Sequence, residues 1–149
     1  MNLRERINAD FKLAMLNHDE RRKVTLNGLK SAIRYKEVEK GAGSQLTDAE
    51  IEAVVAHEVK SRNDSIVVYQ QAGDEARAQQ EQAERDILAE YLPPQLSDEE
   101  LRAKVAEIIQ AGGYSASDFG RIMGQAKAAI GNAADGAAIA AAVREYFAQ

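Results

Sequence analysis

Apolar residues recur every three or four positions along most of the chain. This spacing places them on one side of an α-helix, and no segment alternates polar and apolar residues for long enough to indicate a strand. Four such stripes precede Pro93, and three shorter helical segments lie between residues 97 and 147. The pattern predicts an all-α fold, with an N-terminal four-helix bundle and a C-terminal three-helix module. The first four stripes are Leu3, Ile7, Phe11, Ala14 and Met15; Leu26, Leu29 and Ile33; Ile51, Val54, Val55, Val59, Ile66 and Tyr69; and Ala83, Ile87, Leu88 and Tyr91.

Capping sequences mark several of the expected helix starts. In LTDAEI, Thr47 can accept a hydrogen bond from the first free backbone amides while Glu50 reaches back to the cap residue. LSDEEL repeats this pattern with Ser97 and Glu100, and YSASDF gives a weaker version that begins at Ser115. These sequences predict helix boundaries and carry no function.

The strongest boundary in the chain is the segment LPPQL, residues 92–96. Each proline disfavours the helical conformation of the residue before it, so the fourth helix must end here. We therefore expect a helical subdomain over residues 1–91, a proline hinge over 92–96 and a second helical subdomain over 97–149.

Charge is distributed unevenly along the sequence, whose net charge is −5. Residues 1–40 hold 10 Lys and Arg against 6 Asp and Glu, whereas residues 41–100 hold 4 against 14. A basic N-terminal third could meet phosphate, and the alternative is that these charges form ordinary solvated helix faces. The cations of the second helix that could follow a phosphate backbone are Arg21, Arg22, Lys23, Lys30 and Arg34.

The sequence offers little from which to build a catalytic centre. It contains no cysteine, and its two histidines, His18 and His57, lie far apart without the spacing of a zinc motif. Phosphate-loop and nucleophile-elbow patterns are absent as well. We predict no cofactor and no metal. The N-terminal segment carries charges throughout, so we expect neither a signal peptide nor a membrane span, and a cytoplasmic location.

The segment SDFGRIMGQAKAAIGNAADG contains four glycines among small residues. Gly120 and Gly124 are four positions apart on one helical face, which lets another backbone approach closely. Gly131 would end that helix and Asp135 would cap the next one. Tight packing and turns would explain all four glycines; the alternative is a surface that receives RNA or a protein. The candidates for binding in this segment are Gly120, Gly124, Gly131, Asp135, Arg121 and Lys127.

Four segments of the chain resemble the YqeY-like proteins of bacteria, also called the GatB/YqeY family, over residues 3–147. They are TLNGLKSAIRYKEVEKG, LTDAEIEAVVAHEVKSRNDSIVVYQQAG, AERDILAEYLPPQLSDEEL and DFGRIMGQAKAAIGNAADG. The most specific pieces are Lys60, Arg62, Asp64, Ser65 and Tyr69 before Ala72 and Gly73; Tyr91, Leu92, Pro93, Gln95 and Leu96; and Gly120, Met123, Gly124, Gly131, Asp135 and Gly136.

This resemblance implies an all-helical fold and a link to tRNA. The last segment is similar to the tail domain of the GatB subunit of the aspartyl/glutamyl-tRNA amidotransferase, which is thought to engage tRNA. The family label is carbon–nitrogen ligase activity with glutamine as amide donor, and the matched cations Lys60 and Arg62 join the binding candidates. Glutamine-dependent amide transfer needs a nucleophile and an ATP site. Because the sequence indicates neither, the resemblance favours a binding module that lacks its own catalytic site.

Three positions depart from the family pattern, each with less positive charge than is usual. They are Asn27, Asp74 and Asn132. Each lost phosphate contact weakens RNA binding. Three hypotheses therefore stand: a tRNA-associated accessory module, a helical protein-interaction domain without RNA binding, and an independent amidotransferase or hydrolase. The expected partners are tRNA or a protein, with no membrane and no DNA.

Overall fold

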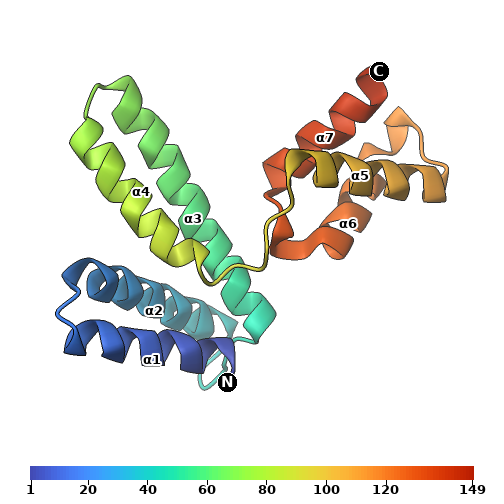
Figure 1. The fold of residues 1–149 in the computed structure, drawn as a ribbon. Coiled ribbons are helices and arrows are strands. Elements are labelled where there is room, and N and C mark those ends of the chain that lie inside the picture. Colours follow the sequence, from blue (N-terminus) through green and yellow to red (C-terminus); the bar gives the residue numbers. More distant parts are fainter. The chain divides into compact units, whose positions relative to one another are not determined.

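The computed structural model describes all 149 residues and contains seven α-helices, two short 3₁₀ turns and no strand (Figure 1). The predicted all-α fold is confirmed. The chain divides into two compact units, Met1–Leu92 and Pro93–Gln149. None of its helices combines the length and the hydropathy that a membrane span requires.

The first unit consists of two helical hairpins. Helix α1 (Leu3–Leu16) packs against α2 (Glu20–Lys40), and α3 (Asp48–Gln71) packs against α4 (Glu75–Ala89), as Figure 1 shows. The apolar stripes expected from the sequence meet between these helices. Burial of such side chains is the main term that stabilises the unit. Its core holds Ile7, Leu26, Leu29, Ile33, Ile51, Val54, Val55, Ile87, Leu88 and Tyr91.

At the end of α1, before the turn into α2, one residue of the predicted apolar stripe is not buried. Met15 is 44% exposed, while Ala14 is buried in the last turn of α1. His18 follows with a φ of +54°, the left-handed conformation that reverses the chain into α2. A turn role therefore accounts for the position of His18.

The predicted helix caps are confirmed in part. Thr47 Oγ1 accepts a hydrogen bond from Glu50 N at 3.2 Å, and the Glu50 carboxylate accepts one from Thr47 N at 2.7 Å. Ser97 likewise caps α5 through Glu100 N at 3.1 Å, but Glu100 returns no hydrogen bond. The predicted hydrogen bond from Ser97 N back to the Glu100 side chain is absent, so this part of the prediction was wrong.

The second unit packs three helices around a separate core. They are α5 (Asp98–Gly112), α6 (Phe119–Ile130) and α7 (Gly136–Ala148), and 3₁₀ turns over Ala116–Asp118 and Gly131–Ala133 connect them. The helix start expected at Ser115 is thus a 3₁₀ turn that leads into α6. The buried residues are Leu101, Val105, Ile109, Ile122, Ala126, Ile130, Ile139, Ala142 and Val143.

The segment that follows the proline pair is hydrogen-bonded within the second unit. Leu96 N donates to Ala133 O at 2.9 Å. The Gln95 side-chain amide donates to Pro93 O at 2.8 Å and to Asn132 O at 2.9 Å. These bonds hold the start of the unit against the 3₁₀ turn between α6 and α7.

Candidate binding surface on helix α6

Helix α6 has one buried face and one bare face. Ile122, Ala126 and Ile130 recur every four residues and are buried in the core of the second unit. On the opposite side Gly120 and Gly124 are exposed. The sequence thus anchors the helix by three apolar side chains and leaves backbone accessible on the other side.

Packing inside the protein does not explain Gly120 and Gly124. A β-carbon added at either position would have no atom within 4 Å beyond the adjacent residues and the backbone of the helix itself. The expectation that tight helix packing accounts for these glycines was therefore wrong. A glycine inside a helix costs about 1 kcal/mol relative to alanine, so both residues lower stability without a compensating contact in the chain.

Gly131 and Asp135 have the structural roles that the sequence indicates. Gly131 ends α6 with a φ of +59°, a conformation that other residues rarely adopt. Asp135 caps α7, its carboxylate accepting a hydrogen bond from Ala137 N at 3.2 Å. Both residues thus shape the turn between α6 and α7.

Arg121 and Lys127 project from α6 as free cations. Both are exposed, and neither takes part in an ion pair, a hydrogen bond or a cation–π contact. Lys127 lies beside the first turn of α7, where a β-carbon added at Gly136 would be 3.6 Å from Lys127 Cε. The ammonium group therefore stands near the start of a helix, where backbone amides without intrahelical partners favour anions.

Most of the basic candidates in α2 are engaged within the first unit. Arg22 pairs with Glu90 at 2.7 Å, Lys23 pairs with Glu20 at 2.9 Å, and the Lys30 ammonium lies 4.4 Å from the centre of the Phe11 ring. The hydrogen bond to Glu90 also raises the pKa of the Arg22 guanidinium. A phosphate would have to compete with these partners.

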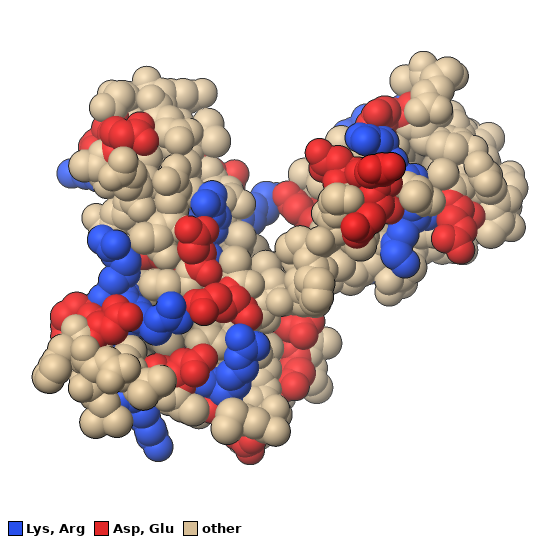
Figure 2. Space-filling view, viewed as in Figure 1, with Lys and Arg blue, Asp and Glu red and all other residues tan.

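Arg21 and Arg34 are the candidates of α2 that remain unpaired. They are thirteen positions apart, about 3.6 helical turns, so they project from different sides of the helix. On the face drawn in Figure 2, Lys and Arg side chains of the first unit alternate with Asp and Glu side chains. Helix α2 therefore brings no row of free cations together.

The two candidates on α3 differ from each other. Arg62 is partly buried between Glu58, at 2.9 Å, and Glu84, at 3.4 Å, and so connects α3 to α4. Lys60 is exposed and has no partner. Arg62 thus stabilises the hairpin, and Lys60 alone is available to a ligand.

The three residues that depart from the pattern of the YqeY-like proteins have different surroundings. Asp74 caps α4, accepting a hydrogen bond from Arg77 N at 3.1 Å, and it also pairs with the Arg77 side chain at 3.5 Å. Asn132 offers its backbone carbonyl to Gln95. Asn27 lies exposed on α2. The acidic residue at position 74 therefore has a structural use as a helix cap.

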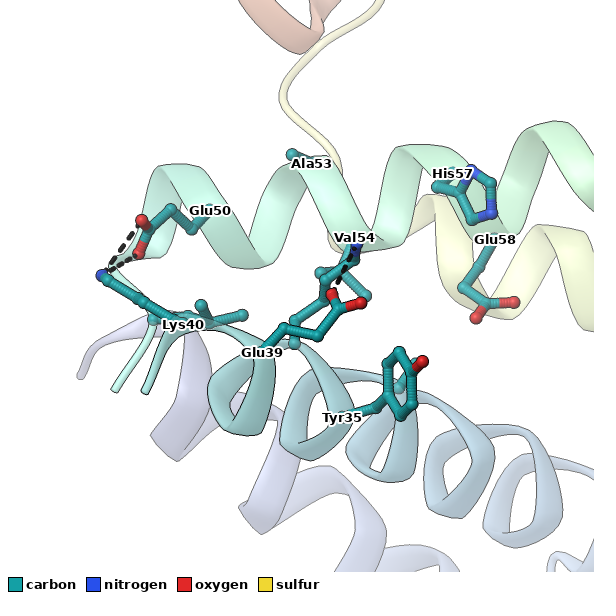
Figure 3. A pocket seen from close by; sticks show the side chains of 11 residues that line it. Tyr35, Glu39, Lys40, Glu50, Ala53, Val54, His57 and Glu58 are labelled. Atoms are coloured by element: carbon teal, nitrogen blue, oxygen red, sulfur yellow. Dashed lines mark hydrogen bonds and ion pairs between the residues drawn. The ribbon is translucent and has the colours of Figure 1, made fainter. Parts of the chain in front are cut away.

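An open groove of about 820 Å³, which was not predicted from the sequence, lies between α2 and α3 (Figure 3). Tyr35 of α2 and His57 of α3 line it, and Leu46 and Val54 contribute apolar surface. No sequence motif spans this groove because its residues come from two helices and the loop between them. Its lining is completed by Ala32, Lys36, Glu39, Lys40, Glu50, Ala53 and Glu58.

The charged side chains that line this groove all take part in ion pairs, and Glu58 pairs with Arg62 outside it. Lys40 pairs with Glu50 at 2.9 Å, as Figure 3 shows, and Lys36 pairs with Glu39 at 3.0 Å. Hydrogen bonds from Thr47 N and the Lys40 ammonium hold the pKa of the Glu50 carboxyl below its usual value. No three His, Cys, Asp or Glu side chains gather anywhere in the chain as metal ligands would. The groove suits apolar contact better than acid–base chemistry.

Comparison with known proteins supports the resemblance that the sequence motifs indicate. A family model described as YqeY-like protein matches residues 4–147. Two curated relatives are named "Altered inheritance of mitochondria protein 41, mitochondrial". The one from Lachancea thermotolerans is 30% identical over 102 residues, covering 67% of this chain and 54% of the relative. The one from Clavispora lusitaniae is 30% identical over 105 residues, covering 69% and 60%. The chain thus spans less than two thirds of these relatives, and by the family match it belongs to the YqeY-like family.

Proposed function

We propose that this protein is a tRNA-associated accessory module that binds RNA through the bare face of α6. The observation that carries the proposal is that Gly120 and Gly124, where an added β-carbon would face open space, lie on the same helix as the free cations Arg121 and Lys127. Exposed backbone next to unpaired positive charge suits a phosphate backbone, because no side chain prevents close approach. The resemblance of this segment to the GatB tail domain supports tRNA as the RNA, and we place the role in the cytoplasm.

The proposed role is binding, not catalysis. The ligase label of the family would need a group to release ammonia from glutamine and a site to activate the acceptor. The chain has no cysteine, and the charged side chains that line the groove between α2 and α3 all take part in ion pairs. Purified protein supplied with glutamine, ATP and tRNA should therefore release no ammonia above background. Sustained glutamine turnover would contradict this part of the proposal.

Fluorescence anisotropy with labelled bulk tRNA at several salt concentrations tests the binding itself. We expect saturable binding whose affinity falls as salt rises. Replacing Arg121 and Lys127 together by alanine should weaken it and reduce the salt slope by about 2, one for each lost phosphate contact. Arg102→Ala with Lys104→Ala is a matched control, because these exposed cations of α5 are also unpaired. A flat titration at low salt, or equal losses in both double variants, would overturn the proposal.

Substitution of Asp135 should raise the affinity for tRNA, whereas substitution of the cations should lower it. Asparagine also caps helices, so Asp135→Asn should preserve α7 while it removes a negative charge next to Lys127 and Gly136. We expect tRNA affinity to rise a few-fold at low salt, and the gain to shrink as salt screens the charge.

A protein-interaction domain without RNA binding is the second candidate function. The apolar lining of the groove between α2 and α3 favours it, because an amphipathic peptide segment could place side chains there. Failure of the tRNA titration would leave this candidate, and substitution of the exposed groove residues Ala53 and His57 would then be the first step.

A further inference from the structure

The outer side of α2 carries a regular row of apolar and small residues that the protein does not cover. The row consists of Val24, Gly28, Ser31, Tyr35 and Val38, which we call the α2 row. Val24 is 60% exposed, Tyr35 67% and Val38 71%. The intervals along the row are four, three, four and three residues. This alternation is the heptad spacing of helices that pack along their length.

Gly28 supports a contact at this row. It lies in the middle of a 21-residue helix, and a β-carbon added there would meet nothing within 4 Å. Glycine at such a position lowers helix stability by about 1 kcal/mol relative to alanine, and nothing within the first unit requires it. A small residue on a helix face allows a second helix to approach closely.

The surface is hollowed where a packing hole would be expected. A shallow depression of about 290 Å³ is lined by Ser31, Arg34, Tyr35 and Val38. In heptad terms Tyr35 is an a position, Ser31 and Val38 are the d positions on either side of it, and Arg34 is the g position before it. Four such neighbouring residues form a hole that receives a side chain from the facing helix.

Charge beside the row fits a second copy of the same helix. In a parallel pair, a g residue faces the e residue five positions further along the partner helix. Arg34 occupies g, and Glu39, five positions later, occupies e. Arg34 has no partner within the protein, and the Glu39 side chain is 48% exposed although it pairs with Lys36. Two copies would therefore form two Arg34–Glu39 pairs, one on each side of the row.

An antiparallel arrangement does not give these pairs. It brings g positions opposite g positions and e positions opposite e positions. Arg34 would then approach its own counterpart, and Glu39 would do the same. The charge pattern thus selects the parallel arrangement.

We propose that the α2 row is a self-association surface, on which the α2 helices of two copies pack in parallel with Tyr35 of each copy in the hollow of the other. The contact from Val24 to Val38 would extend about 21 Å. This is short for a stable dimer, so we expect a dissociation constant on the order of 10 to 500 µM. The proposal is independent of RNA binding, because it uses α2 and not α6.

Sedimentation equilibrium of the full chain from about 5 µM to 1 mM tests the proposal. We expect a monomer–dimer equilibrium that Val38→Glu weakens at least tenfold. Val68→Glu is the matched control, since Val68 of α3 is similarly exposed, at 60%, but lies outside the row. Both side chains are exposed, so neither change should disturb the fold. A monomer over the whole range, or an association that Val38→Glu leaves intact, would overturn the proposal.

Charge reversal tests the orientation. Arg34→Glu and Glu39→Arg should each weaken association about three- to tenfold at low salt. The double variant should return to within about twofold of the original affinity, because the pairs re-form with exchanged signs. Absence of this recovery would refute the parallel pairing.

A disulfide test is clean because the chain has no cysteine. The two copies of a d residue lie close together in a parallel pair, so Ser31→Cys should form a covalent dimer on mild oxidation. Val67→Cys on α3 should not, although Val67 is also exposed. Equal cross-linking of the two variants would overturn the proposal.

Discussion

The hydroxyl of Tyr91 donates a hydrogen bond to Asp10 Oδ2 at 2.5 Å across 81 positions of sequence. The Tyr91 ring is buried, and the Arg6 guanidinium lies 4.7 Å from its centre. Arg6 also donates a hydrogen bond to the carbonyl of Glu90 at 2.9 Å. The residues just after α4 are thereby joined to α1, which closes the four-helix unit by polar contacts at the edge of its core.

Tyr91→Phe should lower the free energy of unfolding by about 1 to 2 kcal/mol. The phenylalanine ring still fills the core, but the Asp10 carboxylate loses its donor. Urea denaturation followed by circular dichroism measures the loss. Tyr35→Phe is the control, because the Tyr35 side chain is exposed and no hydrogen bond from its hydroxyl is present. Equal stability of the two variants would show that the Asp10 contact contributes nothing.

Alkaline pH should destabilise the first unit through the same residue. Burial, together with the hydrogen bond to Asp10, raises the pKa of the Tyr91 hydroxyl well above its ordinary value of 10.0. Above about pH 10 the unfolded chain releases this proton while the folded chain retains it, so the equilibrium shifts toward unfolding. The contribution is complete below pH 10 and is lost as the pH rises toward the folded-state pKa. Unfolding free energies at pH 8, 10 and 11 should fall less steeply in Tyr91→Phe.

Alanine substitutions should stabilise the second unit at the two glycines within α6 and destabilise it at the glycine that ends this helix. Gly120→Ala and Gly124→Ala should each stabilise the second unit by about 0.5 to 1 kcal/mol, because both positions face open space within a helix. Gly131→Ala should destabilise it by about 1 kcal/mol, because alanine disfavours a φ of +59°. Thermal unfolding of the three variants measures both signs. Destabilisation by Gly120→Ala would mean that an unrecognised contact covers that face.

Gly112→Ala should be more harmful than its helical position suggests. A β-carbon there would lie 2.1 Å from the Tyr114 ring, whose hydroxyl accepts a hydrogen bond from the Gln125 side-chain amide at 2.6 Å. The ring would have to move and this link between the start of the 3₁₀ turn and α6 would break, at a cost of about 1 to 3 kcal/mol. Double substitution with Tyr114→Ala should abolish most of the added loss, which a double-mutant cycle measures.

Local signals in the sequence were sufficient for the architecture. The apolar spacing around Ile51 and Val55 placed those residues in the core, and Thr47 with Glu50 marked the start of α3 correctly. The roles of Gly131 as a helix end and of Asp135 as a helix cap were also predicted correctly, because both act within one turn of the chain. Each of these features depends only on residues a few positions apart.

The candidate site was less predictable, because the fate of a charged side chain depends on distant residues. The sequence indicates that Arg22 is a free cation, but it pairs with Glu90, which lies 68 positions away. Arg62 is held by Glu84 in the same way. Whether Gly120 faces a neighbour or open space was equally hidden, since that depends on how α6 packs. Periodicity determines which face of a helix is buried but not what lies opposite the remaining faces.

Hydrogen bonds from Gln95 and Leu96 to the turn after α6 have a practical consequence for dissecting the protein. An isolated C-terminal fragment that begins at Ser97 would leave the carbonyls of Asn132 and Ala133 without these donors, next to the loop that precedes α7. A fragment that begins at Pro93 retains both the donors and the acceptors of these hydrogen bonds. Any attempt to assign RNA binding to the C-terminal half alone should therefore keep the proline pair attached.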